Sequence, residues 1–143
     1  ADYTPIYSEQ KKSDIIFKSI NINAESNVRK VLLDLFNRTQ KGEAEKKYSL
    51  HIDVQKDKTI KSKDKAGNPV LYETKLIFNV KITPFADKND ILHKKTIVEN
   101  FYFKNLDSPS ETANNEDNLT EDYTRVAFSK ISLTINQFSK NDL

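Results

Sequence analysis

The sequence predicts a two-layer α+β sandwich in which a four-stranded mixed sheet carries two helices on one face, in the order β-α-β-β-β-α. The first observation is that every second residue from Tyr72 to Ile82 is apolar or β-branched while the residues between are mostly polar, which is typical of a long strand with one buried face. The second is a helical spacing of apolar side chains over residues 25–40. The third is the length of 143 residues, the size of one ordinary domain.

The first predicted strand covers residues 15–22, and the first predicted helix covers residues 25–40. We expect Asn23 or Ser26 to cap the start of this helix, because short polar side chains accept hydrogen bonds from its first free amides. Gly42 stands where a left-handed residue would end it. The apolar positions follow the spacing i, i+3, i+4, i+7 and i+8 and are Val28, Val31, Leu32, Leu35 and Phe36.

The second predicted strand covers residues 48–55 and continues into a lysine-rich segment, residues 56–65. A turn at residues 66–69 leads into the central strand, and a second turn at residues 84–90 leads into a fourth strand over residues 91–104. Short turns make these three strands an antiparallel meander. The first strand reaches its neighbour through a helix, so we expect that pair to be parallel.

The C-terminal part begins with a polar, acidic stretch, residues 105–120. Its Ser-Pro-Ser-Glu motif at residues 108–111 matches a capping box. Asn114 and Asn115 are weak helix formers, so we expect only a short or frayed turn there, and a firmer helix from about residue 119 to residue 138. The predicted apolar stripe of that helix is Tyr123, Val126, Ala127, Ile131, Thr134, Ile135 and Phe138.

The predicted domain covers residues 15–143, and residues 1–14 are predicted to form an N-terminal tether. The core is expected to hold apolar side chains from both layers. From the strands it should include Ile52, Leu76, Phe78 and Val80, and from the helices Val31, Leu35, Ile131 and Ile135.

Composition argues against most catalytic and nucleic-acid-binding classes. The chain has no cysteine and two histidines, and its carboxylates lack the spacing of a metal site or an acid–base pair, so we interpret it as a non-enzyme without metal or cofactor. The net charge of +2 is too small to indicate nucleic acid. The Phe-Tyr-Phe run at residues 101–103 fits core packing better than a platform for stacking bases.

Charge is unevenly distributed along the chain. Residues 56–65 hold five lysines and two aspartates, a net charge of +3, whereas residues 107–122 hold six carboxylates and no cation, a net charge of −6. A lysine-rich strand end can simply be a solvated edge that discourages pairing between sheets. The alternative interpretation is that these lysines form a docking surface for phosphate groups. The candidate residues are Lys58, Lys61, Lys63 and Lys65, followed by Lys94 and Lys95.

The N-terminal run Tyr3-Thr4-Pro5-Ile6-Tyr7 resembles the start of mature lipopolysaccharide-assembly lipoproteins of the LptE family, alphaproteobacterial type. The resemblance continues through an Ile-rich strand, a helix with Arg29, two long strands and a C-terminal amphipathic helix. In that family a lipidated cysteine stands at the position of Ala1, so the resemblance leads us to expect a precursor with a lipidated cysteine at that position.

Membership of that family would imply a non-enzymatic lipoprotein on the periplasmic face of the outer membrane. Such a protein would assist a β-barrel translocon in assembling lipopolysaccharide, and would bind the barrel, lipopolysaccharide and, through the anchor, the membrane. The lysines named above would meet lipid phosphates. The alternative that the sequence leaves open is a periplasmic α+β module that binds a protein or peptide, for example by adding a strand at a sheet edge.

Overall fold

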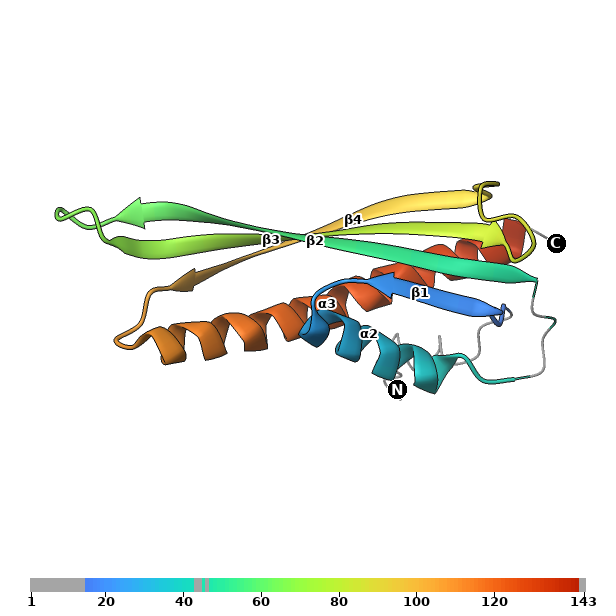
Figure 1. The fold of residues 1–143 in the computed structure, drawn as a ribbon, viewed down its shortest axis with the longest axis horizontal. Helices are drawn as coiled ribbons and strands as arrows, with labels where there is room; N and C mark the ends of the chain where they lie inside the picture. The colour runs from blue at the N-terminus through green and yellow to red at the C-terminus, as the bar shows by residue number, and fades with distance from the viewer. Residues whose placement is uncertain (1–14, 43–44, 46, 142–143) are drawn as a thin grey trace, which may run out of the picture.

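Two long strands joined by a tight turn form the centre of the computed structural model, which describes residues 15–42, 45 and 47–141. They are β2 (Tyr48–Lys63) and β3 (Pro69–Pro84), and they pair antiparallel over almost their whole length. β4 (His93–Lys104) pairs antiparallel with β3, and β1 (Ser19–Asn23) pairs parallel with β2. The sheet order β1-β2-β3-β4 confirms the predicted mixed sheet (Figure 1).

The turn between β2 and β3 is held by one carboxylate. Asp64 Oδ1 accepts hydrogen bonds from the backbone N–H groups of Ala66 and Asn68, both at 2.9 Å. Gly67, between these two residues, has a φ of +89°, a backbone conformation that residues with a Cβ rarely adopt. The register shifts between Ile60 and Lys63, where a bulge increases the local twist of the hairpin.

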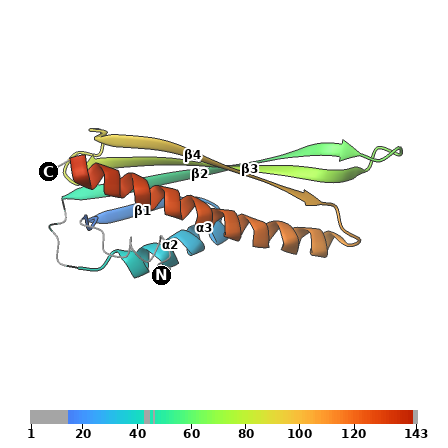
Figure 2. The ribbon, with the colours of Figure 1, turned by 180° about the vertical axis from the view of Figure 1, so that it is seen from behind.

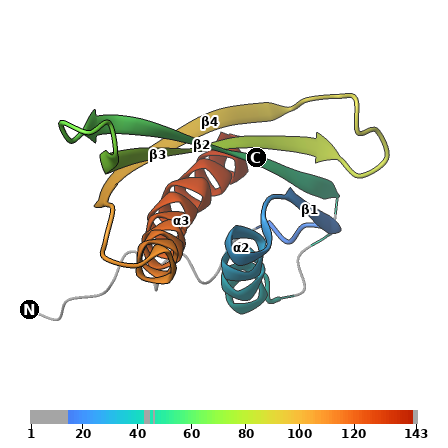
Figure 3. The ribbon, with the colours of Figure 1, turned by 60° about the vertical axis from the view of Figure 1, so that its left-hand side comes forward.

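Both helices, α2 (Ser26–Thr39) and α3 (Pro109–Asn141), lie on the same face of the sheet, as predicted (Figures 2 and 3). Their lengths explain the elongated shape. A helix of 33 residues spans about 50 Å, and a strand of 16 residues spans about 53 Å, so α3 runs along nearly the full length of the central hairpin. α2 packs beside α3 and is less than half as long.

The core fills the space between this sheet face and the helices. Alternate residues of β2 and β3 point into it, and the opposing helix positions complete it. The prediction of the core is confirmed except at Leu35, which is half-buried. The buried apolar side chains of the sheet include Leu50, Ile52, Leu76, Phe78, Val80, Ile82, Ile97, Phe101 and Phe103, and those of the helices include Val28, Leu32, Phe36, Ala127, Phe128, Ile131 and Ile135.

The predicted break before the C-terminal helix is wrong, because α3 is continuous from Pro109 to Asn141. Its start is capped as the motif predicts: the Glu111 backbone N–H donates to Ser108 Oγ at 3.1 Å. The buried Thr112 side chain accepts a hydrogen bond from the Leu106 backbone N–H at 2.8 Å. These contacts, with ion pairs one turn further on, outweigh the weak helix propensity of Asn114 and Asn115.

Three smaller predictions also need correction. The first strand begins at Ser19 rather than residue 15, and the chain before it is held by Gln40, whose side chain bonds the backbone of Ile15 and Phe17. Helix α2 has Glu25 at its N-cap without a side-chain cap, so neither predicted residue caps it. Val126 lies on the solvent side of α3, 45% exposed, and the buried side chain is Phe128. The predicted tether, residues 1–14 with Ala1, lies outside the described residues.

Candidate functional site

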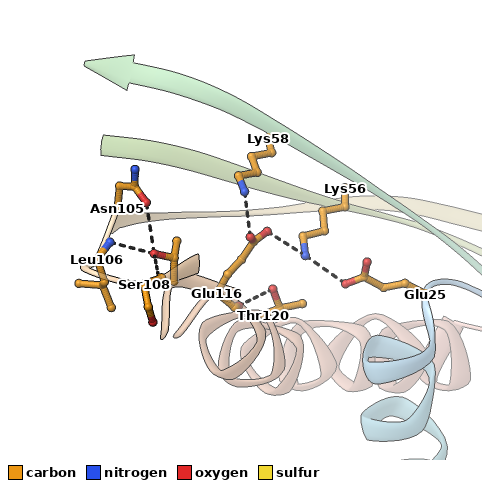
Figure 4. Close-up of polar contacts among 9 residues, drawn as sticks. Glu25, Lys56, Lys58, Asn105, Leu106, Ser108, Glu116 and Thr120 are labelled. Carbon is orange, nitrogen blue, oxygen red and sulfur yellow. Dashed lines mark hydrogen bonds and ion pairs between the residues drawn. The ribbon is translucent and has the colours of Figure 1, made fainter. Parts of the chain in front are cut away.

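The lysine-rich and acidic segments meet in the structure. Glu116, in the first half of α3, projects toward the sheet and pairs with Lys56 and Lys58 of β2, each at 3.1 Å (Figure 4). Lys56 also pairs with Glu25 next to α2, at 3.2 Å. The Glu116 side chain is only 13% exposed, so this network crosses the layers partly shielded from water. The two oppositely charged segments therefore neutralise each other in part.

The pKa values of this network follow from its geometry. Burial of Glu116 alone would raise its pKa, but the hydrogen bonds from Lys56 and Lys58 outweigh that effect and hold the pKa below its ordinary value. Burial of Lys56 would likewise lower its pKa, and the bonds to Glu116 and Glu25 raise it instead. Both shifts favour the charged forms, so the network stays ionised at neutral pH and acts as a structural tie between β2 and α3.

The four candidate lysines of the hairpin differ in whether their charges are already paired within the protein. Lys58 is held by Glu116, and its Nζ lies 4.5 Å from the centre of the Tyr72 ring. Lys61 pairs with Glu73 at 3.2 Å. Lys63 and Lys65 are exposed near the turn and make no ion pair with any residue that the structure describes. Only these two are fully available to an external anion.

Lys94 and Lys95 lie at the opposite end of the sheet. Lys95 pairs with Val80 of β3 and Lys63 pairs with Pro69, eleven residues along the same strand, or about 36 Å. The structure therefore does not join the two groups of predicted lysines into one site.

The second end carries a hollow of about 500 Å³, which we call the lysine hollow. Lys81, Lys94 and Lys95 line it without any carboxylate. Lys81 stands directly across from Lys94 in the strand pairing, an arrangement that is unfavourable unless an anion or water screens the charges. The other lining residues are Asn79, Val80, Ile91 and Thr96.

Large apolar side chains are exposed on the segment between β3 and β4, and one of them, Ile91, lines the lysine hollow. Phe85, Ile91 and Leu92 are each more than 40% exposed, which is unusual for large apolar residues of one short segment. An anionic head group and an apolar tail could therefore both find partners at this end. The sequence analysis missed Lys81, although an antiparallel pairing of the two strands across the turn at residues 84–90 brings it close to Lys94.

The other candidates have structural roles. His51 bonds Thr83 Oγ1 at 3.1 Å, and burial, with nearby Lys81 and Lys88, lowers its pKa. Phe101 and Phe103 are buried, which confirms the core-packing interpretation of the aromatic run. Within the described residues there is no group of three or more metal-ligating side chains. None of the described helices combines the length and hydropathy that crossing a bilayer requires.

Comparisons with known proteins identify the fold but no sequence family. No family model and no curated protein sequence matches the chain. Several solved structures, in contrast, match the fold of the chain. The rare lipoprotein B of Shewanella oneidensis matches with a TM-score of 0.56 at 9% identity, covering 87% of this chain and 96% of that one. Lipoprotein B of Nitrosomonas europaea matches with a TM-score of 0.64 at 14% identity, covering 90% and 89%.

A third structure, a minor lipoprotein of Acinetobacter baumannii, matches with a TM-score of 0.56 at 12% identity over 80% of this chain and 91% of that one. The chain thus has the fold of rare lipoprotein B and minor lipoprotein structures. At these identities the likeness is one of fold alone.

Proposed function

We propose that this protein is a non-enzymatic accessory lipoprotein of the LptE type, which assists an outer-membrane β-barrel in assembling lipopolysaccharide. Two independent lines support the proposal: the resemblance of residues 3–7 to that family, and the shared fold with lipoproteins from three bacteria. The native protein would face the periplasm, anchored through lipid at the position of Ala1.

The lysine hollow is the observation that supports binding of lipopolysaccharide. Three lysines line it without a carboxylate and attract phosphate, and the exposed Ile91 in its lining, followed by the exposed Leu92, suits an acyl chain. We assign the main phosphate contacts to Lys81, Lys94 and Lys95, and weaker contacts to Lys63 and Lys65 at the hairpin turn. Lys58 and Lys61 contribute less, because their charges are already paired.

The test measures binding of the protein to phosphatidylcholine vesicles doped with lipopolysaccharide. Each exposed lysine–phosphate pair contributes at most about 1 kcal/mol, so the three lysines together contribute up to about 3 kcal/mol. The triple variant K81S/K94S/K95S should therefore bind roughly tenfold to a hundredfold more weakly. The double variant K63S/K65S should lose less. Raising the salt from about 0.1 M to about 1 M, which shortens the Debye length from about 10 Å to about 3 Å, should weaken binding by the parent protein.

The matched control is K30S/K41S/K140S, which removes the same charge from exposed positions elsewhere. It should bind within about twofold of the parent, since the effect is local. Equal loss in both triple variants would mean that net charge alone drives binding. Equal binding to lipopolysaccharide stripped of its phosphates would also contradict the assignment.

A periplasmic peptide-binding module is the second candidate function. One specific observation favours it: β1 ends the sheet and carries no charged residue and no proline.

A further inference from the structure

The sheet has two edges, and they differ in how they are protected against pairing with another chain. β4 carries the devices that natural sheets use for protection. Glu99 points inward from it and pairs with Lys130 of α3 at 2.7 Å, and Lys94, Lys95 and Lys104 follow the same strand. A strand added at β4 would have to accommodate these charges.

β1 has none of this protection. Its sequence, Ser-Ile-Asn-Ile-Asn, contains no charged residue and no proline, and it pairs on one side only, with β2. Figure 3 shows β1 at one margin of the sheet with α2 below it. Alternate residues of a strand direct their N–H and C=O groups to each side, so part of the β1 backbone has no strand partner among the described residues.

A hollow of about 380 Å³ lies beside β1 and reaches β2, β3 and α2, with His51, Ile52 and Asp53 of β2 in its lining. Arg29 and Leu33 of α2 line it, together with the β1 residues Ile20 to Asn23. Arg29 is exposed and makes no ion pair with any residue that the structure describes, and Leu33 is 37% exposed. Lys81 also lines the hollow, and Asp53 is the single carboxylate in the lining. The net positive charge of the lining therefore favours an anionic ligand.

We propose that the β1 edge receives an extended acidic segment of another protein, which pairs with β1 as a fifth strand and places a carboxylate against Arg29. The backbone pairing gives affinity for any extended chain, and the Arg29 guanidinium, with its planar set of donors, selects a carboxylate. The five residues of β1 limit the pairing to a short segment. The inference rests on the proposed function only in supposing that a protein partner exists.

The probe is a blocked eight-residue peptide of alternating valine and threonine with two aspartates. It is titrated into the isotope-labelled protein and followed by amide NMR shifts. We expect shifts in β1 and the first turns of α2, and none in β4. A twin peptide methylated on every backbone nitrogen has no backbone N–H left on either edge, so it cannot pair as a strand and should cause at least a tenfold smaller shift. A twin with lysine in place of aspartate should bind more weakly than the acidic one.

The variant R29Q should weaken binding of the acidic peptide about threefold to tenfold, and R38Q, which changes the same residue type on the same helix, should leave it unchanged. Absence of shifts in β1, or equal shifts with the methylated twin, would overturn the proposal. Shifts in β1 that depend on protein concentration without peptide would also overturn it, since the occupant would be a second copy of this chain. No lipid enters this experiment, so its failure is distinct from failure of lipopolysaccharide binding.

Discussion

At the scale of single residues, Glu116 is a charged side chain with a structural role. It joins two lysines of β2 to α3 in a place with little access to water. Removing one partner of such a network leaves the others poorly satisfied, which costs more than the pair would contribute at an exposed site. The network also explains why Lys58, one of the predicted phosphate-binding lysines, is better regarded as part of the fold.

The change Glu116→Gln should lower the free energy of unfolding by about 1–3 kcal/mol at pH 7. The folded-state pKa of Glu116 lies below its ordinary value of 4.5, so its contribution is present above that pH and is lost as the pH falls through the folded pKa. The difference between parent and variant should therefore shrink in acid. Urea unfolding at a series of pH values measures this difference.

The neighbouring change Asp117→Asn is the control, because Asp117 is exposed and makes no ion pair within the described residues. It should alter stability by less than about 0.5 kcal/mol at every pH. A Glu116→Gln variant as stable as Asp117→Asn at neutral pH would show that the network contributes nothing to folding.

At the scale of elements, alternation and helical spacing predicted every strand and helix, because both record which face of each element is buried. The continuity of α3 was not predictable in the same way. Its first half contains Asn114 and Asn115, and what supports them is a cap at Ser108 and an ion-pair network formed with residues almost sixty positions away. Local propensity carries no information about such distant partners.

The cap gives a prediction for α3. Replacing Ser108 by Ala removes the acceptor for the Glu111 backbone N–H and should cost about 1 kcal/mol of stability. The loss should be concentrated at the start of the helix, so amide exchange over the first turns should speed up more than exchange near Phe138. Ser110→Ala is the matched control, since Ser110 is exposed and its hydroxyl contacts Ser108 Oγ at 3.3 Å but accepts no bond from a backbone N–H of the described helix. Equal effects of the two changes would rule out capping by Ser108.

At the scale of the whole molecule, the candidate sites were harder to predict than the fold. The lysine runs were visible in the sequence, but three-dimensional pairing decided which of them stay free: Lys58 is neutralised from α3, and Lys94 gains Lys81 from the next strand. The open β1 edge was equally hidden, since the sequence shows strands but not which of them end the sheet. Sites of this kind depend on the arrangement of elements.

The elongated architecture also predicts how stability is distributed. The central part of the hairpin, near Ile52 and Val80, lies between its neighbouring strands and is covered by the helices. Its distal part, residues 59–68, is exposed along its whole length and extends beyond the start of α3 (Figure 1). Strands with few buried side chains open at low free energy, so native-state hydrogen exchange at residues 59–68 should be about a hundredfold or more faster than at residues 50–54 and 76–82.

Hydrogen exchange at the two ends of the sheet should then respond differently to the change Glu116→Gln. Glu116→Gln removes the last tie between α3 and β2 before the hairpin becomes free, so it should extend fast exchange from the turn back to Lys56 while leaving β4 near Ile97 unchanged. Uniform exchange along β2 in the parent protein would contradict this picture, because it would mean that the sheet opens only as a unit. A graded exchange profile would instead mean that the distal hairpin opens separately, so it can adjust to a ligand while the core stays closed.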